Sequence, residues 1–193
     1  NPQPTFRMAR ERILIVEDEE EILDLVAYNL AKAGYETVRA RSGEEALRRS
    51  GARHLLVRTS WLFGRFGRNF VAAILERARA GEKLRVVIDQ VGSPTYAPDL
   101  VAAVEKLLMA DARGTFHFAN NGACSWFSFA REILAKAGLI VPIEQITTAE
   151  LGRPAPRPAY SVLDTSKYTA VVGETPPPWQ DAIRRYLSEA APS

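Results

Sequence analysis

The chain has 193 residues, of which 47% are hydrophobic and 25% charged, values typical of a globular protein with a sizeable buried core. Its 25 basic and 23 acidic residues leave a formal net charge of +2, so we expect neither nucleic acid nor a membrane surface as a partner. No apolar run approaches the roughly 20 residues that cross a bilayer, and the single cysteine excludes an internal disulfide and suits the reducing cytoplasm.

The N-terminal quarter of the chain alternates strand and helix patterns. Residues 1–7 lack the apolar stretch of a signal peptide, and we interpret them as an added leader. The apolar run at 13–16 predicts a central parallel strand. Apolar residues at helical spacing over 22–30 predict a helix, and a second strand follows at 35–40. Ser42, with a glutamate three residues later, predicts the capping box of another helix, and this β-α-β-α order opens a doubly wound sheet.

Residues 13–47, ILIVEDEEEILDLVAYNLAKAGYETVRARSGEEAL, resemble the opening of response-regulator receiver domains. The resemblance implies that Glu17 and Asp18 form the acidic pair that holds Mg²⁺ beside a phosphoacceptor aspartate. The third strand offers Thr59 or Ser60 where that aspartate should be, so we expect weak Mg²⁺ binding at most and no phosphotransfer. The alternative is that the acidic run is a solvated helix start, stabilised by the helix dipole.

The remaining residues continue the alternation of strands and helices. Buried strands are predicted at 55–57 and 84–88, on either side of a helix that ends at Gly81. Proline and aspartate at positions 98 and 99 are typical of a helix start, which predicts a further helix there. A strand at 115–119 and helices at 125–138 and 179–187 complete the predicted elements.

Across residues 43–190 the motifs RTSWLFG, DQVGSPT, SWFSFA, RPAYSVLDTSK and PPWQ occur in the order and spacing of dTDP-4-dehydrorhamnose reductases, which are extended short-chain dehydrogenases. The resemblance implies that Trp61 contacts the deoxysugar, and an indole packs well on a sugar face. Simple packing is the open alternative for Trp61. The resemblance also implies that four polar residues support the nucleotide side of the substrate lobe: Arg58, Gln90, Ser93 and Thr95.

Several parts of the reductase pattern are missing from the sequence. Residues 43–47 fit both resemblances, so we interpret them as a junction. No Gly-x-x-Gly-x-x-Gly follows the first strand, and the reductase's catalytic Tyr and Lys positions fall near Glu36 and Ala40. Tyr28 and Lys32 have Tyr-x-x-x-Lys spacing, but on the first helix, where such a pair is typical of a solvated face. We therefore predict no bound cofactor, although NADPH is the cofactor of the reductase family, and no enzymatic activity.

These features predict an α/β protein with a three-layer, doubly wound and mostly parallel sheet, a hybrid of flavodoxin-like and Rossmann-like folds with the reductase's small substrate lobe. Residues 8–47 and 48–193 are expected to share one core, with the strand at 55–60 beside the strand at 13–16.

The favoured functional hypothesis is an engineered or recombined chimera without an intact active site, retaining at most weak dTDP-sugar affinity. Strand edges exposed by such a joint predict a homodimer or a domain swap. Two alternatives stay open at this point. One is a working dTDP-4-dehydrorhamnose reductase of dTDP-L-rhamnose biosynthesis, and the other is a receiver-like signalling module.

Overall fold

The computed structural model describes residues 12–16, 18, 20–32, 36–51, 53–152, 155 and 157–190. The chain divides into two compact units, an N-terminal unit of residues 1–56 and a C-terminal unit of residues 57–193. The proposed leader at 1–7 lies outside the described residues.

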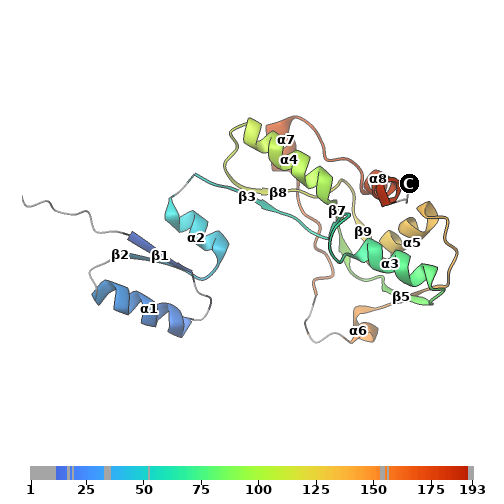
Figure 1. Ribbon diagram of the computed structural model, residues 1–193, viewed down its shortest axis with the longest axis horizontal. Helices are drawn as coiled ribbons and strands as arrows, with labels where there is room; N and C mark the ends of the chain where they lie inside the picture. Colours follow the sequence, from blue (N-terminus) through green and yellow to red (C-terminus); the bar gives the residue numbers. More distant parts are fainter. Residues whose placement is uncertain are drawn as a thin grey trace, which may run out of the picture. The chain divides into compact units, whose positions relative to one another are not determined.

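The N-terminal unit has the predicted β-α-β-α order (Figure 1). Strands β1 (Arg12–Val16) and β2 (Glu36–Ala40) pair in parallel over five residues each. Helix α1 (Glu20–Lys32) packs on this pair through a small buried cluster of Ile15, Leu23 and Ala27. A parallel pair needs a crossover connection, which α1 supplies.

Helix α2 (Gly43–Ser50) has a capping residue at each end, Ser42 before it and Gly51 after it. The Ser42 hydroxyl accepts a hydrogen bond from the Glu45 N–H at 3.2 Å, as predicted, whereas the Glu45 carboxylate accepts from the Arg41 N–H at 2.7 Å rather than from the cap residue. The helix ends at Gly51, whose φ of 67° is favourable only for glycine.

Four strand pairs are described from residue 55 onward. Three of them are β3 (Leu55–Arg58) with β8 (Gly114–His117), β5 (Leu84–Val87) with β10 (Ile143–Ile146), and β4 (Leu62–Phe63) with β7 (Thr95–Tyr96). The β5–β10 and β4–β7 pairs are parallel. The fourth pair, β6 (Val91–Gly92) with β9 (Cys124–Ser125), is antiparallel.

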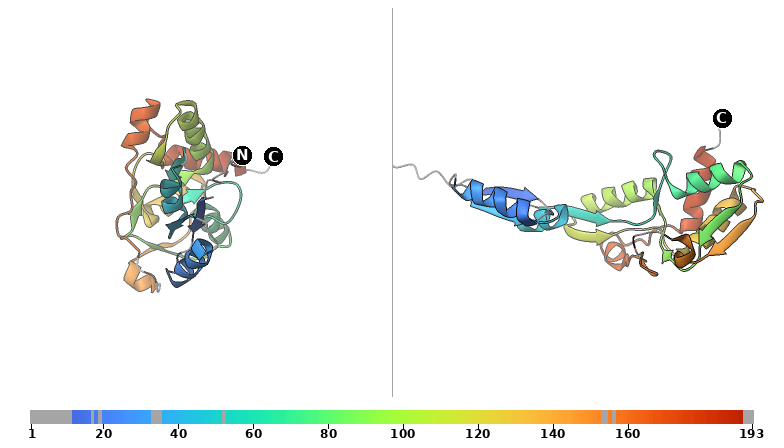
Figure 2. Two further views of the ribbon diagram at one scale, coloured as in Figure 1. Left: turned by 90° about the vertical axis from the view of Figure 1, so that its left-hand side faces the viewer. Right: turned by 90° about the horizontal axis from the view of Figure 1, so that it is seen from below.

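Side-chain caps start two of the long helices of the C-terminal unit. Asn69 caps α3 (Phe70–Arg79) by accepting from the Ala72 N–H at 3.0 Å, and Ser125 caps α5 (Trp126–Lys136) by accepting from the Ser128 N–H at 3.0 Å. Figures 1 and 2 show α3 and α5 side by side, in agreement with their contacts. The other helices are α4 (Ala97–Met109), α6 (Thr148–Leu151), α7 (Ser166–Val172) and α8 (Trp179–Ala190).

The main core lies in the C-terminal unit, between the strands and helices α3, α5 and α8. Phe129, Ile133 and Ile183 are fully buried there. The single cysteine, Cys124, belongs to the same core, and burial raises the pKa of its thiol to about 12. None of the helices in the described part of the chain has both the length and the apolar character to span a bilayer.

The predicted α/β class with mainly parallel pairing is confirmed. A continuous sheet was expected, but the described strands form separate two-stranded pairs. Four of the strands, β4, β6, β7 and β9, have only two residues each. A strand of two residues is too short to show an alternation of apolar and polar residues in the sequence. The single core shared by residues 8–47 and 48–193 stays a prediction.

Candidate functional site

A cavity of about 660 Å³ lies in the C-terminal unit between α3, β5 and the segment at 157–161. Its wall combines two kinds of side chain. One part is aromatic, and the other carries arginines and hydrogen-bonding groups. The wall includes Trp61, Phe70, Trp126, Arg77, Arg85, Gln90 and Arg157. Cavities of this size, with an apolar body and a few placed polar groups, are typical of small-molecule sites.

The aromatic part is built on two neighbouring tryptophans. The ring centroids of Trp61 and Trp126 lie 3.5 Å apart, and the planes differ by 12°, so the indoles are stacked. Phe70, the first residue of α3, closes the group with its ring centroid 4.6 Å from that of Trp126. The Asn69 and Ser125 caps fix the helix starts that carry Phe70 and Trp126.

A short chain of hydrogen bonds orients Gln90 on the polar side. The Gln90 side-chain amide donates to the Thr148 hydroxyl at 2.9 Å, and that hydroxyl donates to the Asp89 carboxylate at 2.8 Å. The Thr148 N–H also donates to Asp89, which lowers the pKa of this carboxyl, and the Thr148 hydroxyl lowers it further. Asp89 is therefore ionised near neutral pH and holds Thr148 in place for Gln90.

Three arginines give the cavity wall positive charge. Arg77 pairs with Glu82 at 2.7 Å, and Arg85 lies 3.7 Å from the Glu144 carboxylate. Among the residues that the structure describes, Arg157 has no ion-pair partner, so its guanidinium is available to a ligand. Guanidinium groups bind phosphate oxygens in a bidentate way, and a wall with several of them suits a diphosphate.

The site residues predicted from the sequence lie in three different places: in the cavity wall, behind it and away from it. Trp61 and Gln90 line the cavity. Ser93 and Thr95 are buried behind it, where the Ser60 hydroxyl donates to the Ser93 carbonyl at 2.7 Å and the Thr95 N–H donates to the Trp61 carbonyl at 3.2 Å. They support the Trp61 loop rather than face a ligand.

Arg58 lies away from the cavity wall. Its guanidinium is 3.5 Å from Nε2 of His117 on the neighbouring strand. Arg77, Arg85 and Arg157 line the cavity but were not among the predicted site residues. The motif RPAYSVLDTSK contains Arg157 and could have indicated it. Arg77 and Arg85 carry no such signal, because exposed arginines on a helix and a strand are common on any surface.

The predicted Mg²⁺ pair falls partly outside the described residues, since Glu17 is not described. Asp18 is exposed, and no group of three or more potential metal ligands gathers anywhere in the described part of the chain. Tyr28 is 65% exposed on α1, as expected for a solvated helix face.

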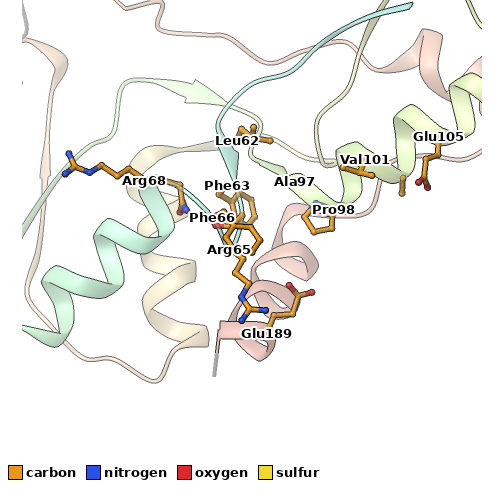
Figure 3. A pocket seen from close by; sticks show the side chains of 13 residues that line it. Leu62, Phe63, Arg65, Phe66, Arg68, Ala97, Pro98, Val101, Glu105 and Glu189 are labelled. Atoms are coloured by element: carbon orange, nitrogen blue, oxygen red, sulfur yellow. Dashed lines mark hydrogen bonds between the residues drawn. The ribbon is translucent and has the colours of Figure 1, made fainter. Parts of the chain in front are cut away.

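A second cavity, of about 570 Å³, opens between the loop after β4 and the start of α4 (Figure 3). Its wall is mainly apolar, with Leu62, Phe66 and Val101 largely exposed. Figure 3 shows the Arg65 side chain extending toward Glu189 at its edge. One cavity thus combines aromatic rings with several guanidinium groups, and the other is an open apolar groove.

Comparisons with known proteins match most of the chain. A family model described as RmlD substrate binding domain matches residues 35–191. The spore coat polysaccharide biosynthesis protein SpsK of Bacillus subtilis (strain 168) is 44% identical over 149 residues, covering 77% of this chain and 52% of that protein. A dTDP-4-dehydrorhamnose reductase of Sinorhizobium fredii is 36% identical over 156 residues, covering 75% of this chain and 53% of that protein.

Solved structures agree with these matches. The structure of a dTDP-4-dehydrorhamnose reductase from Bacillus anthracis in complex with NADP superposes with a TM-score of 0.73 at 36% identity, covering 77% of this chain and 53% of that one. The chain therefore spans about half the length of the relatives that it matches.

The matches correct three predictions made from the sequence. The relatives are named as reductases, so the expectation of a chimera without an active site is wrong, and so is the expectation of a chain that is not an enzyme. The expectation of no cofactor is also wrong, because a similar structure holds NADP. The reductase part of the resemblance is confirmed, whereas the receiver fragment finds no support.

Proposed function

This chain belongs to the RmlD substrate binding domain family, and from that membership we propose that it holds the nucleotide sugar in an NADP-dependent reductase of dTDP-linked 4-keto sugars. One structural observation carries the proposal. The 660 Å³ cavity combines aromatic side chains with three arginines, which suits a ligand that has a sugar and a diphosphate.

The side chains have separate roles in this proposal. Arg157, Arg85 and Arg77 neutralise the diphosphate, and Trp61 receives the hexose. Gln90, held by Thr148, offers a directed hydrogen-bonding group to the ligand. Reduction of the keto sugar adds a hydride to the carbonyl carbon and a proton to its oxygen, and NADPH would supply the hydride. The residues of the cavity wall bind and orient the sugar for that step.

The turn after β1 does not fit a dinucleotide. No glycine lies between Val16 and Glu20 in the sequence, and Asp18 and Glu20 are exposed carboxylates there. A pyrophosphate needs close backbone approach and positive charge, and this turn offers negative charge. No step of the reaction is therefore assigned to residues of this turn.

Calorimetric titration with dTDP tests the proposal. The wild-type chain should bind, and Arg157→Ala should weaken binding roughly ten- to a hundred-fold, because a charge-assisted contact to the diphosphate is lost. Arg184→Ala is the matched control, since Arg184 lies on α8 and pairs with Asp181 outside the cavity. Absence of dTDP binding to the wild-type chain would contradict the proposal.

Oxidation of NADPH in the presence of a dTDP-linked 4-keto-6-deoxyhexose tests the reductase activity separately from binding. Two earlier expectations stay predictions: a homodimer or domain-swapped assembly, which light scattering would detect, and a cytoplasmic location.

A further inference from the structure

The indole of Trp61 is covered on both faces. Trp126 overlaps one face at 3.5 Å. On Gly92, an added Cβ would lie 2.5 Å from Cε2, 2.7 Å from Cζ2 and 2.8 Å from Nε1 of Trp61. Cε2 is bonded to both Cζ2 and Nε1. A Cβ that approached the edge of the indole in its plane would be closer to Cζ2 and Nε1 than to Cε2. Because Cε2 is the nearest of the three atoms, Gly92 lies over the face of the ring. The stacked Trp126 ring leaves no room for the glycine backbone on its own side, so Gly92 covers the opposite face.

The backbone of Trp61 is held in an unusual conformation. Its φ is 45°, in the left-handed region that bulky residues rarely adopt. The hydrogen bond from the Thr95 N–H to the Trp61 carbonyl, at 3.2 Å, helps to fix it. Strained positions of this kind persist where the surrounding structure imposes them, and they cluster at ligand sites. The strain fixes Trp61 in the cavity wall.

Of the two covers, Trp126 is the one that can move without breaking the pairing of β6 and β9. Gly92 belongs to β6, and its backbone pairs with Cys124 in β9. Trp126 contributes a half-buried side chain, on the first residue of α5, which lines the cavity and also contacts the rings of Phe70 and Phe129. Rotation about its side-chain bonds would expose the face of Trp61 toward the cavity while both strands stay paired.

We propose that Trp126 is a gate: its indole occupies the face of Trp61 that the hexose takes, and the nucleotide sugar displaces it on binding. The inference rests on the proposed function and extends it, because it names the side chain that must move and the moiety that moves it. The hexose has to compete with an aromatic stack, whereas the dTDP moiety does not. Trp126 therefore affects selectivity between dTDP and dTDP-hexose.

Calorimetry with two probes, dTDP alone and dTDP-L-rhamnose, tests the gate. Trp126→Ala should bind dTDP-L-rhamnose about two- to tenfold more tightly than the wild-type chain, because the stacking interaction no longer competes. Binding of dTDP alone should stay unchanged. Trp126→Phe, which keeps an aromatic ring at the start of α5, should give a smaller increase and guards against loss of folding in the alanine variant.

The control variant is Trp179→Phe, which removes a tryptophan that does not line the cavity. Its affinity for both probes should equal that of the wild-type chain. Weaker or equal dTDP-L-rhamnose binding by folded Trp126→Ala would overturn the gate, because Trp126 would then be a direct contact or a bystander.

Circular dichroism provides an independent measurement on the wild-type chain. Two stacked indoles couple excitonically and give a paired band in the far ultraviolet. Saturation with dTDP-L-rhamnose should abolish this band, and dTDP should leave it intact. If the sugar binds and the band persists, the gate is wrong while the proposed function stands. If neither probe binds, both are wrong.

Discussion

Gly92 shows how the absence of one side chain permits the arrangement of the cavity wall. Gly92→Ala would place a Cβ 2.5 Å from the Trp61 indole, which is too close for any real contact. Trp61 or the β6 backbone has to shift, and we expect about 1–3 kcal/mol of lost stability in urea unfolding, together with weaker dTDP-sugar binding. Gly43→Ala is the matched control, since its Cβ would meet open space at the start of a helix. Equal stability of the two variants would refute the close packing.

At the residue scale, sequence reasoning identified the Trp61 position but not its surroundings. The motif RTSWLFG placed the indole in the site, and the structure places it in the cavity wall. Ser93 and Thr95 were expected to support the nucleotide side of the lobe, and the structure buries both behind the Trp61 loop. Thr95 lies in β7, which has two residues and so shows no alternation from which its buried side could be predicted.

At the element scale, a buried ionic network ties α8 to the start of α4. Arg185 on α8 donates two hydrogen bonds to Asp99, at 2.6 and 2.7 Å, and the Asn120 side chain donates to the same carboxylate at 2.6 Å. Asp99 raises the pKa of Arg185 through these contacts. The Tyr96 hydroxyl donates to Glu189 at 2.6 Å and adds a second link to α8.

We predict that Arg185→Met destabilises the protein by roughly 2–4 kcal/mol, because it leaves the Asp99 carboxylate buried without its cation. Arg184→Met, one position away and 69% exposed, should be nearly neutral, since exposed ion pairs contribute little. Thermal or urea unfolding of both variants measures the difference. Similar stability would mean that α8 is held by its apolar face alone.

Helices were predictable at this scale, and most short strands were not. The Ser42 cap starts α2 where the sequence indicates. Helix α6 was not predicted, although Thr147 and Glu150 form a capping box there, because four residues give no apolar periodicity. A strand of two residues is defined by its pairing with a partner strand, and the partners of these strands lie far away in the sequence.

At the scale of the whole molecule, the cavity belongs entirely to the C-terminal unit. Hydrogen exchange with and without dTDP should therefore show added protection in β5, α3 and the segment at 157–161, and none in β1 and β2. At a ligand concentration about 100-fold above Kd, linkage adds about 2.7 kcal/mol to the stability of the unit that binds. Protection confined to residues 12–51 would place the site elsewhere.

The division into two units was not predictable from hydrophobic patterns. Periodicity identifies a strand such as 13–16 but not the strand that will lie beside it, and two α/β segments in succession read like one sheet. Family motifs were the stronger signal for function, since they extend over most of the chain.

Cys124 is the single cysteine of the chain, and its thiol is buried with a raised pKa. Thiolate, the form that reacts with maleimides and iodoacetamides, is therefore scarce and shielded in the folded protein. One cysteine engineered on the surface would take up a dye or spin label at that place only. The native sequence is thus ready for spectroscopic labelling, with no residue to be replaced beforehand.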